Sequence, residues 1–178
     1  MKTAILIPAR YGSTRFEGKP LAMLDGVPMI KRVYDACTAS KIPTYVLTDD
    51  MRIFDLFGPR QCWIDQEKEY ANGTERCAGA ITDSNFIKYL GHYDNIINVQ
   101  GDMPDVDVAM IQQVQWHLQH YPVTTAFTEM PLNMQEDPNT VKMIKAGDQA
   151  LWFGRGITGY GDWHLGIYGY RRNALEMY

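Results

Sequence analysis

Three cationic side chains gather in one short segment near the start of the sequence. Arg10, Arg15 and Lys19 lie among glycine, serine and threonine residues, directly after the apolar residues 4–8. An apolar run of this length predicts a buried strand, and ligands of open α/β sheets bind beyond the carboxyl ends of the strands. The segment therefore predicts a polyphosphate site. A solvated basic loop is the alternative for the segment taken by itself.

Polar residues also follow later apolar runs. Asp102 comes after residues 95–99 and Gly101, where its carboxylate could face the basic loop. Carboxylate oxygens bind Mg²⁺, which in turn binds phosphate oxygens, so Asp102 is a candidate metal ligand. The alternative is an aspartate that only forms a turn. The polar residues 48–50, Thr-Asp-Asp, follow the apolar residues 45–47 in the same way.

Asn72, Gly73 and Thr74 form a third polar segment. Glycine permits close approach of a ligand to the backbone, and the short side chains could hydrogen-bond a base or a ribose. A helix N-cap is the alternative interpretation. The sequence has no Walker loop, no G-x-G-x-x-G, no H-E-x-x-H and no C-x-x-C motif, so it predicts neither an obvious dinucleotide enzyme nor a zinc enzyme.

Composition narrows the class of protein. The 178 residues are 46% hydrophobic and carry a net charge of −4, which is typical of a globular domain over residues 1–178 and gives no electrostatic case for nucleic-acid binding. Cys37, Cys62 and Cys77 have no metal-binding spacing, and their odd number predicts buried free thiols in a reducing, cytoplasmic compartment. No targeting or membrane-spanning segment is visible, so we expect no membrane partner.

The apolar pattern predicts an α/β fold with a mixed, mostly parallel central sheet flanked by helices. Strands are expected at residues 4–8, 45–47, 61–64 and 95–99, and helices at residues 28–40, 51–57, 72–82 and 105–120. This alternation predicts parallel strands. Further strands at residues 124–130, 141–146, 150–153 and 165–170 have few helices between them, and the turn at Gly147 favours a hairpin. The last third should therefore be more antiparallel.

Taken in order, the motifs resemble those of the CMP-KDO synthetases, the 3-deoxy-manno-octulosonate cytidylyltransferases. The matching segments are Ile7-Pro8-Ala9-Arg10-Tyr11 with Gly18-Lys19-Pro20-Leu21, Thr48-Asp49-Asp50, Gly73-Thr74-Glu75-Arg76, Asn98-Val99-Gln100-Gly101-Asp102, Pro138-Asn139 with Val141-Lys142, and His164-Leu165-Gly166-Ile167-Tyr168-Gly169-Tyr170-Arg171. The resemblance implies a Rossmann-like nucleotidyltransferase fold. It also implies Mg²⁺-dependent transfer of CMP from CTP to KDO or a related acidic sugar, with release of pyrophosphate, as in lipopolysaccharide biosynthesis.

The resemblance further implies roles for single residues. Arg10 and Lys19 would be catalytic and hold the triphosphate, and Asp102 would be catalytic as a metal ligand. The nucleotide contacts would comprise Ala9, Arg10, Arg15, Lys19, Asn72, Gly73, Thr74 and Arg76. The sugar would lie near Gln100, Arg155, His164 and Tyr168. Taken without the resemblance, a lone histidine such as His164 is more often structural.

The sequence departs from the family pattern at the phosphate loop and at the metal site. Glu17 stands beside the loop, and Met103 replaces a carboxylate that the family carries. The family's second metal carboxylate lies in a C-terminal Val-Asp-Thr-Pro-Glu-Asp block, which the sequence does not contain. We therefore expect a single-carboxylate metal site, low activity, or a contribution from another copy; Asp105 and Asp107 are the nearest substitutes.

Three hypotheses for the function follow. The first is a compact cytidylyltransferase that acts on CTP and an acidic sugar. The second is a nucleotide-binding module with little or no catalysis that acts through a partner. The third is an enzyme of the same fold with a different sugar acid or nucleotide. A homodimer is also expected, because exposed strand edges in the second half need to be covered.

Overall fold

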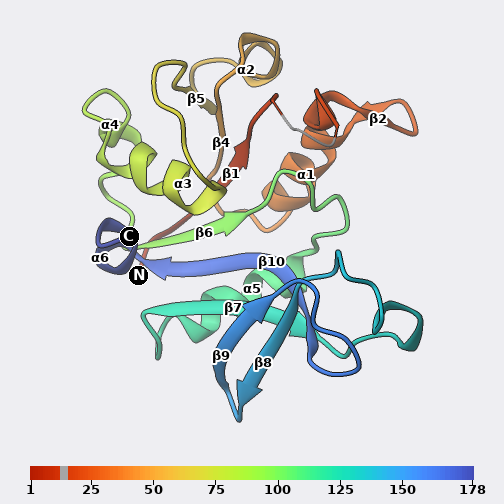
Figure 1. Cartoon of the computed structure of the whole chain (residues 1–178). Coiled ribbons are helices and arrows are strands. Elements are labelled where there is room, and N and C mark those ends of the chain that lie inside the picture. Colours follow the sequence, from red (N-terminus) through yellow and green to blue (C-terminus); the bar gives the residue numbers. More distant parts are fainter. Residues whose placement is uncertain (13–15) are drawn as a thin grey trace. The chain divides into compact units, whose positions relative to one another are not determined.

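The computed structural model describes residues 1–12 and 16–178, and the chain divides into two compact units (Figure 1). The first unit comprises Met1–Thr124 and Ile167–Tyr178, and the second comprises Thr125–Gly166. Strand β10 (Asp162–Arg171) begins in the second unit and ends in the first. The single domain expected over residues 1–178 stays a prediction.

A mostly parallel sheet forms the centre of the first unit. Its strands lie in the order β5 (Cys62–Ile64), β4 (Thr44–Thr48), β1 (Thr3–Ala9), β6 (Asn95–Val99) and the second half of β10. The first four strands are parallel, and β10 is antiparallel to β6. Because β4 and β6 flank β1 in parallel, the carboxyl ends of all three open at one edge of the sheet. The predicted fold class is confirmed.

Helices cover both faces of this sheet (Figure 1). On one face, α3 (Gly73–Thr82), α4 (Ile87–Leu90) and α6 (Arg172–Glu176) share a buried cluster with the strands, to which β1 contributes Leu6 and α3 contributes Cys77 and Ile81. Alternate strand residues point to opposite faces, so the buried Ile5 and Ile7 lie on the other face. There α1 (Met29–Thr38) and α5 (Val108–His117) pack.

Local sequence signals explain where these helices begin and end. Helix α2 (Met51–Phe57) has the predicted bounds: the Asp50 side chain caps it by accepting a hydrogen bond from the Arg52 backbone N–H at 2.9 Å, and Gly58 ends it with a φ of 73°. Helix α5 begins later than predicted, because the Asp107 side chain caps it by accepting a hydrogen bond from the Met110 backbone N–H at 2.7 Å. No helix in the described part of the chain is both long and apolar enough to cross a membrane.

Several short elements of the first unit carry no strong sequence pattern and were not predicted. They are the 3-10 helix η1 (Lys19–Leu21), the two-residue strands β2 (Met23–Leu24) and β3 (Val27–Pro28), and the helices α4 and α6. Elements of two to five residues are too short to show a periodicity. One of them, η1, carries a residue of the predicted phosphate site, Lys19.

The second unit is antiparallel, as its sequence predicts. Strands β8 (Lys142–Ala146) and β9 (Gln149–Gly154) form a hairpin, whose turn has Gly147 at a φ of 55°. The first half of β10 pairs with β8 in the antiparallel sense, and β7 (Val123–Thr128) also pairs with β10. The unit contains one further 3-10 turn among its described residues, η2 (Leu132–Met134). Strand β9 ends the strand order and so forms an edge.

The three cysteines are buried and free, as predicted. Burial raises the pKa of the Cys37 and Cys62 thiols to about 12, and it raises the pKa of the Cys77 thiol still further above its ordinary value. All three thiols are therefore protonated and apolar in character at neutral pH.

Candidate functional site

The strongest feature at the open edge of the first sheet is an ion pair between two predicted site residues. The Lys19 Nζ lies 2.6 Å from the Asp102 Oδ2, although 83 residues separate them in the sequence. Lys19 begins η1 after the β1 loop, and Asp102 follows β6, whose end is tied to β1 by a hydrogen bond from the Gly101 N–H to the Pro8 carbonyl at 3.2 Å. Both side chains are about half exposed, so a ligand can reach the pair.

Three further residues of the basic segment were predicted to contact the nucleotide, namely Ala9, Arg10 and Arg15. Ala9 is buried as the last residue of β1, and Arg10 is exposed directly after it. Arg15 lies outside the described residues. Of the three predicted cations, the structure therefore places Arg10 at the end of β1 and Lys19 beside Asp102.

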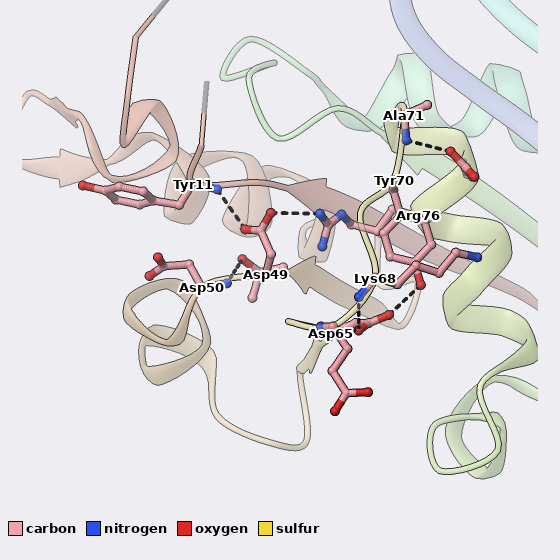
Figure 2. Close-up of polar contacts among 11 residues, drawn as sticks. Tyr11, Asp49, Asp50, Asp65, Lys68, Tyr70, Ala71 and Arg76 are labelled. Atoms are coloured by element: carbon pink, nitrogen blue, oxygen red, sulfur yellow. Dashed lines mark hydrogen bonds and ion pairs between the residues drawn. The ribbon is translucent and has the colours of Figure 1, made fainter. Parts of the chain in front are cut away.

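Tyr11 holds the beginning of the basic loop in place. Its backbone N–H donates to the Asp49 Oδ1 at 3.0 Å, and its carbonyl accepts from the Gly18 N–H at 3.0 Å. The Arg52 guanidinium stacks over its ring, 3.5 Å from the centroid. Arg52 also hydrogen-bonds the Asp50 carboxylate through two nitrogens, which holds the pKa of Asp50 below its usual value. Figure 2 shows the hydrogen bond from the Tyr11 N–H to the Asp49 carboxylate.

The segment predicted to contact the cytidine forms the start of α3. The Asn72 side chain caps the helix, because its Oδ1 accepts the Glu75 backbone N–H at 2.9 Å. Its Nδ2 donates to the Tyr178 hydroxyl at 3.0 Å. Glu75 reaches back to the Ala71 N–H at 2.7 Å, which satisfies a second donor at the helix start. The N-cap interpretation of Asn72 is thus confirmed, and a nucleotide contact stays a prediction.

Gly73 brings α3 against the end of β6. A Cβ atom at Gly73 would lie 2.8 Å from the Gln100 Oε1 and 2.8 Å from the Pro8 side chain, which is closer than any side chain tolerates. The structure therefore brings together a residue predicted to contact the nucleotide, Gly73, and one predicted to contact the sugar, Gln100. Only glycine permits this close approach.

A buried chain of hydrogen bonds runs from Gln100 to β10. The Gln100 Nε2 donates to the Asn98 Oδ1 at 3.0 Å, and the Asn98 Nδ2 donates to the Thr74 hydroxyl at 3.3 Å. The Thr74 hydroxyl in turn lies 3.4 Å from that of Tyr170, against which Tyr168 stacks with ring centroids 6.2 Å apart. Burial raises the pKa of Tyr170 to about 12 and raises that of Tyr168, so both phenols are protonated at neutral pH.

Arg76, also predicted to contact the nucleotide, is almost completely buried, and that contact stays a prediction. Its side chain is 6% exposed, and its Nη2 lies 2.9 Å from the Asp49 Oδ2. Its guanidinium also stands over the Tyr70 ring at 5.1 Å. The Tyr70 hydroxyl donates to Asp65 at 2.7 Å. Figure 2 shows Asp49 between Tyr11 and Arg76, and Asp65 hydrogen-bonded to Tyr70.

The second unit carries the other two residues predicted to lie near the sugar. The exposed Arg155 donates from its Nε to the Asn139 carbonyl at 3.1 Å. His164 is buried, its Nε2 lies 2.8 Å from the Thr125 hydroxyl, and its ring meets Phe153 edge-on with centroids 4.9 Å apart. Burial lowers the pKa of His164 to about 4, so the ring is neutral at pH 7. Arg155, and not His164, is therefore the cation among these two residues.

A divalent cation fits this site only with ligands beyond the protein. No group of three or more His, Cys, Asp or Glu side chains in residues 1–12 and 16–178 is arranged to hold a metal ion. Asp102 is exposed and offers a single carboxylate, while Asp107 is committed to capping α5. Mg²⁺ commonly keeps several waters and binds through one or two carboxylates plus substrate phosphates. The residues present therefore fit a magnesium ion that arrives with a polyphosphate.

Sequence reasoning assigned no role to Tyr11, Asp49, Arg52 or Asn98, although the structure places all four around the predicted site. The signal for Asp49 was visible, because it belongs to the polar segment 48–50 that follows an apolar run. The signal for Asn98 was an amide inside a fully buried strand, where polar side chains need a partner.

Comparisons with known proteins show which proteins the chain is similar to. Residues 4–178 match the model of a protein family described as cytidylyltransferase. An 8-amino-3,8-dideoxy-manno-octulosonate cytidylyltransferase of Shewanella woodyi is 37% identical over all of this chain and 78% of its own length. A 3-deoxy-manno-octulosonate cytidylyltransferase of Brucella ovis is 35% identical, again over all of this chain and 76% of its own.

Solved structures also resemble the chain. A CMP:2-keto-3-deoxy-manno-octonic acid synthetase complexed with CTP superposes with a TM-score of 0.82 at 31% identity, over 99% of this chain and 76% of the other. A glucose-1-phosphate thymidylyltransferase described as putative, from Bacillus anthracis, has a TM-score of 0.71 at 12% identity over 97% of this chain and 73% of the other. The second likeness is one of fold alone.

Because His164 is buried as a neutral ring, we predict that it makes the protein less stable in acid. The unfolded-state pKa of 6.5 exceeds the folded-state pKa of about 4. The unfolded chain therefore binds the proton first, and stability falls as the pH drops from about 6.5 toward 4. Since one pKa unit corresponds to about 1.4 kcal/mol, the full loss reaches about 3 kcal/mol. The free energy of unfolding, obtained from denaturant titrations between pH 7.5 and 4.5, measures this loss.

The matched variant removes the titratable ring. His164→Gln should flatten the pH dependence of the free energy of unfolding. The same slope in wild type and His164→Gln would contradict the prediction.

Proposed function

Because the chain belongs to the cytidylyltransferase family, we propose that it transfers CMP from CTP to an eight-carbon acidic sugar of the KDO type, with release of pyrophosphate. The observation that carries this proposal is the exposed pair of Lys19 and Asp102 at the carboxyl ends of β1 and β6, with Arg10 at the end of the same strand. A cation for phosphate and a carboxylate for a metal ion thus stand side by side.

The nucleotide would lie along the open edge of the first unit. Arg10 and Lys19, with Arg15, would hold the triphosphate through charge-assisted hydrogen bonds, and Ala9 would line its path. The cytidine would lie at the start of α3, where Asn72, Gly73 and Thr74 present backbone and short polar groups. The support for this placement is the contact between Gly73 and the end of β6. That contact puts the start of α3 two residues from Asp102.

We also propose that Gln100, Tyr168, Arg155 and His164 are the residues that contact the acidic sugar. Gln100 supports this assignment because it lies against Gly73, beside the proposed cytidine site. Arg155 supplies the cation that a sugar carboxylate requires. His164, neutral at pH 7, would act as a hydrogen-bonding group for hydroxyls.

Magnesium would be held by Asp102 together with phosphate oxygens and water. When bound, the ion would neutralise charge on the phosphates and so favour nucleotidyl transfer. A phosphate chain would compete with Asp102 for the Lys19 Nζ, which would release the carboxylate toward the metal ion. The remaining requirement is in-line positioning of the sugar hydroxyl, which rigid strand ends supply. The three buried free thiols support a reducing, cytoplasmic location for this reaction.

Pyrophosphate release tests the proposal. The chain is mixed with CTP and Mg²⁺ and then with KDO, 8-amino-3,8-dideoxy-manno-octulosonate or sialic acid in turn. We expect pyrophosphate with one of the two octulosonates and none with CTP alone. Binding of CTP without pyrophosphate release from any sugar would instead favour a nucleotide-binding module that acts through a partner. Absence of CTP binding would overturn the proposal.

Substitutions of Lys19 and Asp102 should affect different steps, CTP binding and turnover respectively. We predict that Lys19→Ala weakens the affinity for CTP by roughly 10- to 150-fold but leaves that for cytidine unchanged, since it removes one charge-assisted phosphate contact worth about 1.5–3 kcal/mol. Asp102→Asn should leave CTP bound in the absence of metal and should reduce kcat by at least about 100-fold. Calorimetric titration and initial rates measure the two effects. Equal losses for CTP and cytidine would contradict the phosphate role of Lys19.

We also propose that the protein forms a homodimer through the second unit. The edge strand β9 exposes Leu151, Trp152 and Phe153, and Trp152 is 65% exposed. Unpaired apolar edges of this kind are usually covered in native proteins. Light scattering should give twice the chain mass of 20.4 kDa for the wild type and a smaller mass for Trp152→Glu. A monomer mass for the wild type at micromolar concentration would contradict it.

A further inference from the structure

Tyr11 is the point at which the basic loop is fastened to the rest of the first unit. Its backbone N–H and carbonyl are both used outside the β1 ladder, by Asp49 and by Gly18 respectively. The hydrogen bond from Gly18 closes the loop immediately before Lys19. The positions of Arg10, which precedes Tyr11, and of Lys19, which follows Gly18, therefore both depend on where Tyr11 is held.

Asp49 is well placed to hold it. The register pairs Ala9 of β1 with Thr48 of β4, so Asp49 stands one residue beyond the last paired position. There its carboxylate accepts the Tyr11 N–H in place of a strand carbonyl, which extends the attachment between the two strands into the loop. The other oxygen of the same carboxylate accepts from the Arg76 Nη2 at 2.9 Å.

Arg76 fixes the orientation of this carboxylate. Its side chain is 6% exposed whereas that of Asp49 is 32% exposed, so the cation is the more deeply buried partner. Removal of one member of a buried ion pair leaves the other charge uncompensated. The pair is therefore strongly constrained, and an Asp49 carboxylate without Arg76 would be free to turn toward water and release the Tyr11 N–H.

We infer that Arg76 is a positioning residue that acts on the phosphate loop through Asp49, and not a direct contact of the nucleotide. The relay runs from α3 through the Asp49 carboxylate to the Tyr11 N–H, and so to Arg10 and Lys19 (Figure 2). This inference rests on the proposed function only for the identity of the ligand. The attachment itself is a property of the protein without nucleotide.

The surroundings of Arg76 support this role. One nitrogen of the guanidinium, Nη2, donates a hydrogen bond to Asp49, and the group lies over the Tyr70 ring at 5.1 Å from its centroid. Its Nη1 is buried without a hydrogen-bond partner among the described residues. The guanidinium is therefore enclosed by the protein, with its side chain only 6% exposed.

Amide hydrogen exchange at Tyr11, in the absence of nucleotide, tests the attachment directly. Arg76→Met should speed exchange of this amide on the order of tenfold, which corresponds to about 1.4 kcal/mol and lies within measured couplings of contacting residues. Arg76→Lys, which keeps a cation, should restore part of the protection. Asp35→Asn, which removes a carboxylate from an exposed ion pair with Lys31, should have no effect.

A double-mutant cycle on CTP affinity tests whether Arg76 acts through Asp49. Asp49→Asn and Arg76→Met should each weaken CTP binding on the order of tenfold, and the double variant should lose no more than the larger single loss. Cytidine binding should not change. The double variant carries no unpaired buried charge. It should therefore fold and allow CTP binding to be measured even if one of the single variants does not fold.

The outcomes separate this inference from the proposed function. Additive losses in the cycle, or unchanged Tyr11 exchange in Arg76→Met, would overturn the relay and favour direct contact of Arg76 with the nucleotide. If the wild type binds no CTP, the proposed function fails, while Tyr11 exchange still decides whether Arg76 anchors the loop.

Discussion

The parallel placement of β1 between β4 and β6 is the constraint on which the site depends. Neighbouring parallel strands end at the same edge of the sheet. The loops that follow Ala9, Thr48 and Val99 therefore all begin at that edge. Contacts between these loops follow: Asp49, directly after β4, accepts the Tyr11 N–H from the loop after β1, and Asp102, after β6, pairs with Lys19. The site is therefore assembled from strand ends, and its precision comes from the rigidity of a buried sheet.

The sheet also explains how a series of hydrogen bonds between polar side chains can run through the interior. Asn98 is fully buried in β6, where an unpartnered amide would be costly. Its two polar atoms are satisfied by Gln100 and Thr74. The same contacts fix α3 against β6, and the glycine at the start of α3 allows the helix to come close enough. The interactions that stabilise the fold at this position are thus the ones that shape the proposed cytidine site.

The sequence predicted the long elements, because these leave local signals. The roles of the site residues, most of them assigned from the family resemblance, stay predictions. The apolar runs of β1 and β6 and the periodic pattern of α1 are visible without tertiary context. The sequence does not show that Lys19 pairs with Asp102 or Asp49 with Arg76. These partners are distant in sequence, and only the strand order brings them together. Burial of Arg76 could not be predicted either, since arginines on short amphipathic helices usually face solvent.

The raised pKa values of the three buried cysteines have a practical consequence for work on this protein. A thiol reacts with maleimides and similar reagents as the thiolate, and Cys37, Cys62 and Cys77 are enclosed as well as protonated. The native chain is thus close to a cysteine-free background for chemical labelling. A cysteine introduced at an exposed position would be the reactive one, and dyes or spin labels could be attached in pairs without removal of any native residue.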